Sequence, residues 1–188
     1  MASSDPRDGR VLLGQGNFLA PAESRAVAAA VRERSWWQPS EVGEAGQSTV
    51  DRSHCRSVWC WLPEPQRRMV LRRLVTVARA AAGATPRLQE PLVLRYRRGD
   101  YFRRHRDEYS ERHGAHRRMS MIAFLTGANE RDGFRGGELR FHVDAADGPL
   151  SVRVPGRLGT FVTFAAELEH EVLPVLSGER LTLVTWLY

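Results

Sequence analysis

The chain has 188 residues, 42% of them hydrophobic and five of them Trp, which is enough for one packed domain with a single core. The formal net charge is +6 and every basic residue is Arg, so a Schiff-base enzyme and a P-loop lysine are excluded. No apolar run approaches the roughly 20 residues of a membrane helix, and the polar stretch 1–10 lacks the apolar core of a signal peptide, so we expect a cytoplasmic protein.

The N-terminal half of the chain predicts two helices. Residues 1–10 are expected to form a flexible terminus and 11–19 a first strand, within one domain over 11–188. A helix is predicted from Pro21 to about Arg34, because Pro is favoured in the first turn and Ala-rich sequence follows. A second helix is predicted after Pro63-Glu64-Pro65 and ends at Gly83. Its apolar positions form one stripe, made of Met69, Val70, Leu74, Val77 and Ala78.

The segment between these helices contains the only two cysteines. Residues Ser40 to Ser53 are rich in Gly, Ser and Glu and predict a mobile loop, which is typical of lids and binding loops. A short strand is predicted over 56–62. Cys55 and Cys60 would face opposite sides of such a strand, so they are interpreted as packing residues and not as a disulfide or a paired metal site.

From about Leu92 the sequence changes to short strands separated by turns that contain Gly, Asp or Pro. The predicted strands are 92–97, 101–107, 117–125, 137–143, 150–154, 159–164, 169–175 and 179–188. Short strands at this spacing favour a sandwich or barrel, and a double-sheet jelly roll is one way to protect their edges. The predicted fold class is therefore α+β and mainly β, with the two helices packed on one sheet.

Two His-x-Asp pairs occur in this half, His105-Arg106-Asp107 and His142-Val143-Asp144. Residues two positions apart on a strand point to the same side, so such a pair can offer an imidazole and a carboxylate to one metal ion. Chance alone supplies about 0.26 such pairs in a chain of this composition, so context has to decide. Asp144 leads into a turn, and we interpret His142 as an ordinary histidine. The first pair lies within a predicted strand and is the candidate for a metal site.

His170 can supply a third ligand, because two His and one carboxylate form the facial triad of non-haem Fe(II) oxygenases. If Ser177-Gly178 closes a hairpin, the following strand returns antiparallel and lines the same cavity. Its cavity face would be formed by Arg180, Thr182, Val184 and Trp186. A buried Arg180 requires an anion, which a dicarboxylate co-substrate would provide through a bidentate contact. The alternative is a solvated arginine at the start of a strand.

Five ordered sequence blocks in about 92–188 resemble the Fe(II)- and 2-oxoglutarate-dependent dioxygenases, specifically the prolyl 4-hydroxylase-like group. The first block is Tyr96, Gly99, Phe102, His105 and Asp107. The next two are Arg118 and Ser120 with the apolar run 122–125, and Gly136-Gly137-Glu138-Leu139. The last blocks are His170, Val172 and Pro174-Val175, and Gly178, Arg180 and Trp186.

This resemblance implies a double-stranded β-helix, a form of jelly roll, with a motif-bearing β core at about 92–188. His105, Asp107 and His170 are implied to hold Fe(II), and Arg180 to bind the distal carboxylate of 2-oxoglutarate. Tyr96 is implied to line the co-substrate pocket. Many relatives carry Tyr at the positions of Phe102 and Phe124, so hydroxyl contacts to the co-substrate are expected instead from Ser120, Thr182 or water. Ascorbate is a further candidate cofactor.

The implied reaction couples conversion of 2-oxoglutarate to succinate and CO2 with hydroxylation of a C–H bond in an amino-acid-like small molecule or a peptidyl residue. The basic balance keeps oxidative dealkylation of nucleic acid open as an alternative, although Arg is distributed throughout the chain. A non-catalytic jelly-roll binding module is a second alternative. The expected partner is a small-molecule or peptide substrate, and no membrane or nucleic acid. Several arginines around the site suggest an acidic substrate: Arg103, Arg104, Arg106, Arg112, Arg117 and Arg118.

Overall fold

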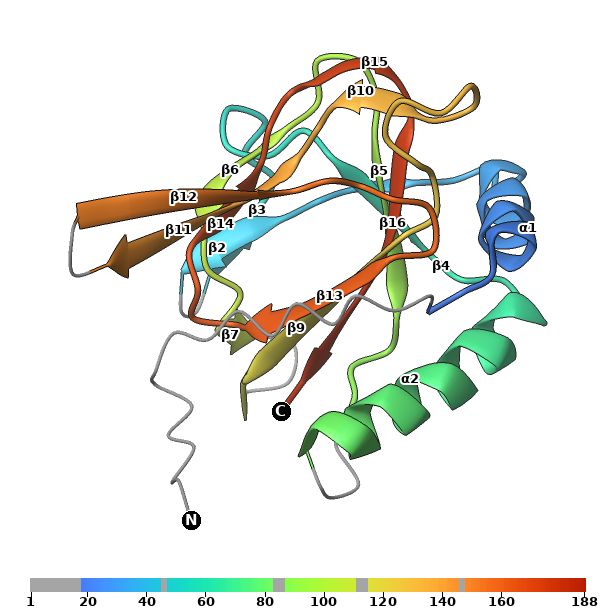
Figure 1. Cartoon of the computed structure of the whole chain (residues 1–188), viewed down its shortest axis with the longest axis horizontal. Helices are drawn as coiled ribbons and strands as arrows, with labels where there is room; N and C mark the ends of the chain where they lie inside the picture. The colour runs from blue at the N-terminus through green and yellow to red at the C-terminus, as the bar shows by residue number, and fades with distance from the viewer. Residues whose placement is uncertain (1–17, 45–46, 83–86, 111–114, 146–147) are drawn as a thin grey trace.

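Two β-sheets face each other in the computed structural model, and two helices cover the outer face of the larger sheet (Figure 1). The structure describes residues 18–44, 47–82, 87–110, 115–145 and 148–188. The helices are α1 (Pro21–Arg32) and α2 (Gln66–Ala82). Neither of these two described helices is long and apolar enough to cross a membrane.

The larger sheet has six antiparallel strands with β16 near its centre. Its strands, in spatial order, are β1 (Gln38–Pro39), β4 (Val58–Trp61), β5 (Leu92–Tyr96), β16 (Arg180–Leu187), β9 (Met119–Phe124) and β13 (Phe161–Ala165). The register places Arg180 opposite Tyr96 on β5, and Trp186 opposite Ser120 on β9. Residues that are far apart in the sequence therefore become direct cross-strand neighbours.

The smaller sheet has four antiparallel strands, and β14 lies between β11 and β6. In spatial order they are β12 (Gly148–Val154), β11 (Leu139–Ala145), β14 (His170–Val172) and β6 (Phe102–His105). Three further antiparallel pairs are β10 (Phe134–Gly136) with β15 (Val175–Gly178), β2 (Val42–Glu44) with β3 (Gln47–Thr49), and β7 (Tyr109–Ser110) with β8 (Ala115–His116).

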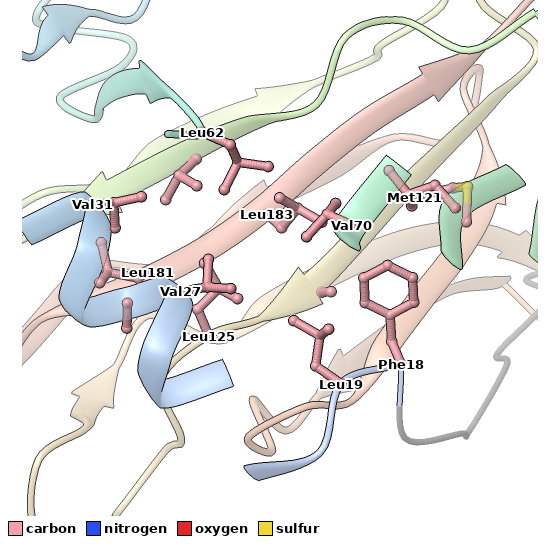
Figure 2. Close-up of a cluster of buried hydrophobic side chains, with 14 of the residues drawn as sticks. Phe18, Leu19, Val27, Val31, Leu62, Val70, Met121, Leu125, Leu181 and Leu183 are labelled. Carbon is pink, nitrogen blue, oxygen red and sulfur yellow. The ribbon is translucent and has the colours of Figure 1, made fainter. Parts of the chain in front are cut away.

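Successive side chains of β16 point to opposite faces, so this strand contributes to two hydrophobic cores. Leu181, Leu183 and Leu187 pack with the helices, whereas Val184 and Trp186 pack between the two sheets. Figure 2 shows the helix-side core, where α1 and α2 meet the leucines of β16. The predicted stripe of α2 is confirmed, since Val70, Leu74 and Ala78 are buried, with Met69 and Val77 packed beside them.

The start of α1 is tied to α2 by one carboxylate. Ala20 has no side chain that can cap the helix, and its N–H donates instead to Glu23 Oε2 at 2.8 Å. Arg73 of α2 also donates to Glu23 Oε2, at 2.8 Å, and to the carbonyl of Phe18 at the same distance. These contacts fix the angle at which the chain enters α1, and they join the two helices on the sheet.

The predicted fold class and both predicted helices are confirmed. In three places the local structure differs from the prediction. The 40–53 segment is not a structureless loop, because β2 and β3 pair within it as an antiparallel hairpin. Residues 11–17 of the predicted first strand lie outside the described residues, and Phe18 and Leu19 form a bend instead of a strand. Cys55 and Cys60 are both free and buried, but only Cys60 lies on a strand.

The hairpin predicted at Ser177-Gly178 is wrong. β14 ends at Val172, and a separate strand, β15, pairs with β10 before the chain crosses to β16 in the other sheet. Gly178 makes this crossing with a φ of +77°, and a Cβ added there would lie 2.0 Å from the carbonyl oxygen of Gly133. His170 and Arg180 therefore belong to opposite sheets, and both are buried.

Candidate active site

The three predicted metal ligands are brought together between the sheets. His105 ends β6 and His170 begins β14, and the two are direct cross-strand partners. Asp107 follows β6 and is held by its N–H, which donates to the carbonyl of Ala166 at 2.7 Å. The ligand atoms of the three residues all lie within 4.8 Å of one another. This cluster of two imidazoles and one carboxylate can hold one metal ion.

Backbone carbonyls orient both imidazole rings. Nδ1 of His105 lies 2.7 Å from the carbonyl oxygen of Arg103, and Nδ1 of His170 lies 2.9 Å from that of Leu168. A carbonyl can only accept, so each Nδ1 carries the proton and each Nε2 presents its lone pair. The two Nε2 atoms each lie 3.6 Å from an oxygen of Asp107. The hydrogen bonds therefore select the nitrogen that faces the metal position.

Asp107 receives two hydrogen bonds on the same oxygen. Ser120 Oγ donates to Oδ2 at 2.7 Å, and Trp186 Nε1 donates to Oδ2 at 3.0 Å. Oδ1 receives neither of these bonds and is the oxygen left to bind a metal. Ser120, which was predicted to contact the co-substrate, thus directs its hydroxyl to the carboxylate ligand. The hydrogen bond from Trp186 to Asp107 was not predicted. The sequence did predict that Trp186 and Arg180 lie on the same face of their strand.

The protonation states in this cluster suit a cation. Burial lowers the pKa of His105 below its ordinary value, and the neighbouring His170 lowers it further. Burial alone would raise the pKa of Asp107, but the two imidazoles, the Ser120 hydroxyl and Arg117 bring it below its ordinary value. At neutral pH His105 is neutral and Asp107 is ionised, which is the state that metal binding requires.

Arg180 is buried in the same interior with two of its donor atoms unused. Its side chain is 1% exposed, Nη1 donates to Thr182 Oγ1 at 3.2 Å, and Nε and Nη2 have no hydrogen-bond partner among the described residues. Burial lowers the pKa of this guanidinium to about 10, so it stays charged at neutral pH. A buried cation with two free donors is the environment expected for a bound carboxylate.

Aromatic rings and a glycine shape the space around Arg180. Its guanidinium carbon lies 5.0 Å from the ring centroid of Tyr96 and 5.2 Å from that of Phe124. Gly137 has a φ of +64°, and a Cβ there would lie 3.2 Å from Arg180 Cδ and 2.8 Å from Val175 Cγ2. Burial raises the pKa of the Tyr96 phenol, with the positive charge of Arg180 acting against this shift. Tyr96 and Thr182 therefore both lie beside the Arg180 guanidinium, and their contact with a co-substrate stays a prediction.

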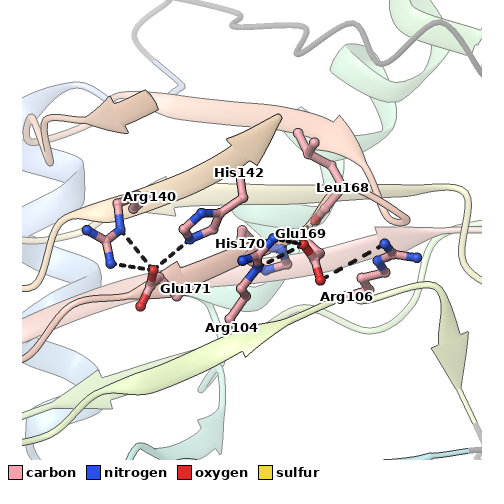
Figure 3. Close-up of polar contacts among 8 residues, drawn as sticks. All are labelled: Arg104, Arg106, Arg140, His142, Leu168, Glu169, His170 and Glu171. Atoms are coloured by element: carbon pink, nitrogen blue, oxygen red, sulfur yellow. Dashed lines mark hydrogen bonds and ion pairs between the residues drawn. The ribbon is translucent and has the colours of Figure 1, made fainter. Parts of the chain in front are cut away.

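His142, from the second His-x-Asp pair, belongs to a cluster separate from the metal ligands. His142 Nε2 lies 2.7 Å from Glu171 Oε1, which also accepts from Arg140 Nε at 2.8 Å, as Figure 3 shows. Burial would raise the pKa of Glu171, but hydrogen bonds from Arg140 and His142 keep it below its ordinary value. His142 thus contacts Glu171 on the outer face of the smaller sheet. Among the described residues, it is not one that could share a metal ion with His105.

Comparison with known proteins identifies the class that this fold and site define. Residues 91–188 match the model of the 2OG-Fe(II) oxygenase superfamily, and the chain belongs to this family. It is therefore an oxygenase that uses Fe(II) and 2-oxoglutarate. The residues fit these groups, since the triad is a suitable donor set for iron and Arg180 has buried donors free for a carboxylate. No curated protein matches the sequence.

Several solved structures share the fold over most of their length. A Pseudomonas putida prolyl-4-hydroxylase is 25% identical, with a TM-score of 0.68 over 92% of this chain and 90% of that one. A Trichoplax adhaerens prolyl hydroxylase, solved with a peptide of the hypoxia inducible factor oxygen degradation domain, is 16% identical, with a TM-score of 0.70 over 92% and 81%. The viral collagen prolyl hydroxylase of Paramecium Bursaria Chlorella virus-1, solved with 2OG, is 18% identical, with a TM-score of 0.60 over 91% and 92%.

Proposed function

We propose that this protein hydroxylates a C–H bond of a peptidyl residue or an amino-acid-like small molecule, with release of succinate and CO2. The observation that carries this proposal is the pairing of the triad with Arg180, whose free Nε and Nη2 are buried in the same interior. A buried cation with unused donors is costly to keep unless an anion binds it.

Each side chain has a defined task in this proposal. His105, Asp107 and His170 would hold Fe(II), which together with 2-oxoglutarate and O2 supplies the oxidising power for the C–H bond. Arg180 would bind the distal carboxylate of 2-oxoglutarate through its two free donors, with Thr182 holding Nη1 in place. Tyr96 and Phe124 would flank that carboxylate and exclude water.

The remaining groups would position the ligands. Ser120 and Trp186 fix the rotation of the Asp107 carboxylate, and the Phe102 ring stacks on His105 with centroids 3.6 Å apart and planes at 7°. The His105 and Asp107 side chains are 15% and 12% exposed, compared with 3% for His170. Substrate would therefore approach from the side of β6.

Peptidyl prolyl residues are the substrates we test first, because the similar structures include prolyl hydroxylases and one of them was solved with a peptide. Iron-loaded protein with 2-oxoglutarate and O2 is incubated with proline-containing peptides or free amino acids, and succinate is measured. We expect at least one candidate to stimulate succinate release in the wild type and not in His105→Ala. Methylated nucleic acid as the sole stimulating substrate would contradict the proposal and favour oxidative dealkylation.

A further inference from the structure

Two arginines beside the metal-site strand lie over the ring of Tyr101. We call this group the Tyr101 platform, made of His54, Arg56, Tyr101 and Arg103. The guanidinium carbons of Arg56 and Arg103 lie 5.4 Å and 5.7 Å from the Tyr101 ring centroid. Both arginines are exposed, and neither has a carboxylate of the described residues within 4.0 Å. The platform thus presents unneutralised positive charge around an aromatic ring.

Neighbouring arginines on the outer face of the smaller sheet differ from the platform. Arg104 and Arg106 both contact Glu169, and Arg140 contacts Glu171 (Figure 3). Arg117 is also engaged, with its guanidinium carbon 3.8 Å from the Trp186 ring and Nη2 donating to Gln89 Oε1 at 3.1 Å. Of the arginines predicted to attract an acidic substrate, Arg104, Arg106 and Arg117 are thus already engaged, whereas Arg103 belongs to the platform. Arg118 is exposed, and Arg112 lies outside the described residues.

The platform is held by backbone contacts and not by its side chains alone. Arg56 N–H donates to the Tyr101 carbonyl at 3.0 Å, and Arg103 N–H donates to the His54 carbonyl at 2.9 Å. Between these two bonds, Cys55 and Phe102 form an antiparallel bridge. The 54–56 segment therefore extends the edge of β6, and the arginines are displayed on a rigid base.

Ring contacts connect the platform to the metal ligands. The His54 ring meets the Phe102 ring edge-on with centroids 5.9 Å apart, and Phe102 stacks on His105 at 3.6 Å. The centroids of the His54 and His105 rings are therefore no more than about 9.5 Å apart, a distance that about three residues of extended polypeptide can span. The exposed edge of the metal site also faces β6, the strand on which the platform is built.

From this arrangement we infer that the Tyr101 platform binds an acidic side chain of a polypeptide substrate, about two to four residues from the residue that is oxidised. This inference rests on the proposed function and names its substrate class. A polypeptide is required because one ligand must reach both the platform and the metal. Asp51, the one carboxylate in 51–57, accepts from the N–H and hydroxyl of Ser53 and forms no ion pair with Arg56 or Arg103 within 4.0 Å.

Nucleic acid fits this surface less well. A phosphate chain needs a continuous track of free cations, because each phosphate must be neutralised in turn. Beyond Arg103 the surface carries Glu169 and Glu171, whose carboxylates bind the nearby arginines and would repel phosphates. A short acidic segment needs only Arg56 and Arg103.

The test compares two fluorescein-labelled peptides, a Pro-Ala-Glu repeat and a matched Pro-Ala-Gln repeat. Their binding is followed by fluorescence anisotropy on the full chain with Fe(II) and 2-oxoglutarate in the absence of O2. We expect the Glu peptide to bind about tenfold more tightly than the Gln peptide, as about two exposed ion pairs allow. Arg56→Gln together with Arg103→Gln should remove this preference, and each single change should remove part of it.

Arg72→Gln is the matched control, because Arg72 is exposed on α2, far from β6 in Figure 1. It should bind both peptides as the wild type does. The inference is overturned if the double variant keeps the Glu preference, or if single-stranded oligo-dT competes more strongly than the Glu peptide for the same arginines. The visible absorption of the iron and 2-oxoglutarate complex is recorded in each sample. Its absence with an intact Glu preference would overturn the proposed chemistry while supporting the platform.

Discussion

At the scale of single residues, the site is defined by which polar atoms have partners and which do not. The Nδ1 atoms of His105 and His170 are used by backbone carbonyls, so both Nε2 atoms remain for a metal. Oδ2 of Asp107 is used by two donors, whereas Nε and Nη2 of Arg180 are free among the described residues. The free imidazole nitrogens are electron-pair donors and indicate a metal ion, whereas the free N–H groups of Arg180 indicate a carboxylate.

We predict that His105→Ala or Asp107→Ala abolishes both iron binding and turnover, because either change removes a metal ligand. His142→Ala should keep most of the activity, because His142 contacts Glu171 on the outer face of the smaller sheet. Iron content and succinate release are measured on all three variants. Equal loss in all three would show that the two His-x-Asp pairs were assigned wrongly.

We also predict that Trp186 and Ser120 are positioning residues for the carboxylate ligand. Trp186→Phe or Ser120→Ala should weaken metal affinity by about tenfold, and the double variant should weaken it more, because each donor holds Asp107 Oδ2. Affinity is measured by metal competition titration without O2 or substrate. Trp36→Phe is the control, since Trp36 is exposed. An unchanged affinity in the double variant would refute the assigned role.

At the scale of secondary-structure elements, β16 connects the chemistry to the core. One face of this strand packs on the helices, and the other carries Arg180, Thr182 and Trp186 toward the smaller sheet. The turn before this strand sets its register, and a slip of one residue would exchange the helix-side face and the site face. The crossing at Gly178 therefore has to be fixed tightly.

We predict that Gly178→Ala destabilises the protein by more than about 2 kcal/mol, because it adds strain at positive φ and a clash with the Gly133 carbonyl. The matched control is Gly99→Ala, where φ is +84° but nothing lies within 4 Å of the added Cβ. This control should cost about 1 kcal/mol. Chemical unfolding of both variants gives the comparison. Equal losses would show that strain alone, without the clash, determines the effect.

The clustering of His105, Asp107 and His170 and the burial of Arg180 could be predicted from sequence, because each residue lies in a recognisable local pattern and the patterns follow one another in the expected order. The contact between Trp186 and Asp107 could not, because it depends on the register of strands that are distant in the sequence. The pairing of β15 with β10 was missed for the same reason: Ser177-Gly178 has the composition of a hairpin turn, but tertiary pairing overrides it. The β2–β3 hairpin has too few apolar residues to stand out from a loop.

At the scale of the whole molecule, two cores stabilise the fold, and one of them contains the site. The helix-side core is apolar throughout, whereas the core between the sheets also encloses His170 and Arg180 and borders His105 and Asp107. Burying ionisable groups in this core makes the stability of the metal-free protein depend on pH.

We predict that the metal-free protein loses stability as pH falls below about 6.5, the ordinary pKa of His. The folded-state pKa of His105 is lowered, so the unfolded chain binds a proton that the folded chain does not, and the loss approaches about 1.4 kcal/mol per pH unit. Asp107 contributes stability that is lost only below its ordinary pKa of 3.8. Urea unfolding with EDTA at about pH 7 and 5 measures the slope. His105→Gln should flatten it, and an unchanged slope would contradict the assignment.

The most direct test of the central claim is the absorption of Fe(II)-loaded protein on addition of 2-oxoglutarate without O2. We expect a weak visible metal-to-ligand band in the wild type and none in His105→Ala. Arg180→Met should raise the 2-oxoglutarate concentration for half-saturation by about 100-fold, because the loss of one partner of a buried charged contact is costly. Folded, iron-loaded protein that shows no band, or an Arg180→Met variant that saturates as the wild type does, would contradict this account of the site.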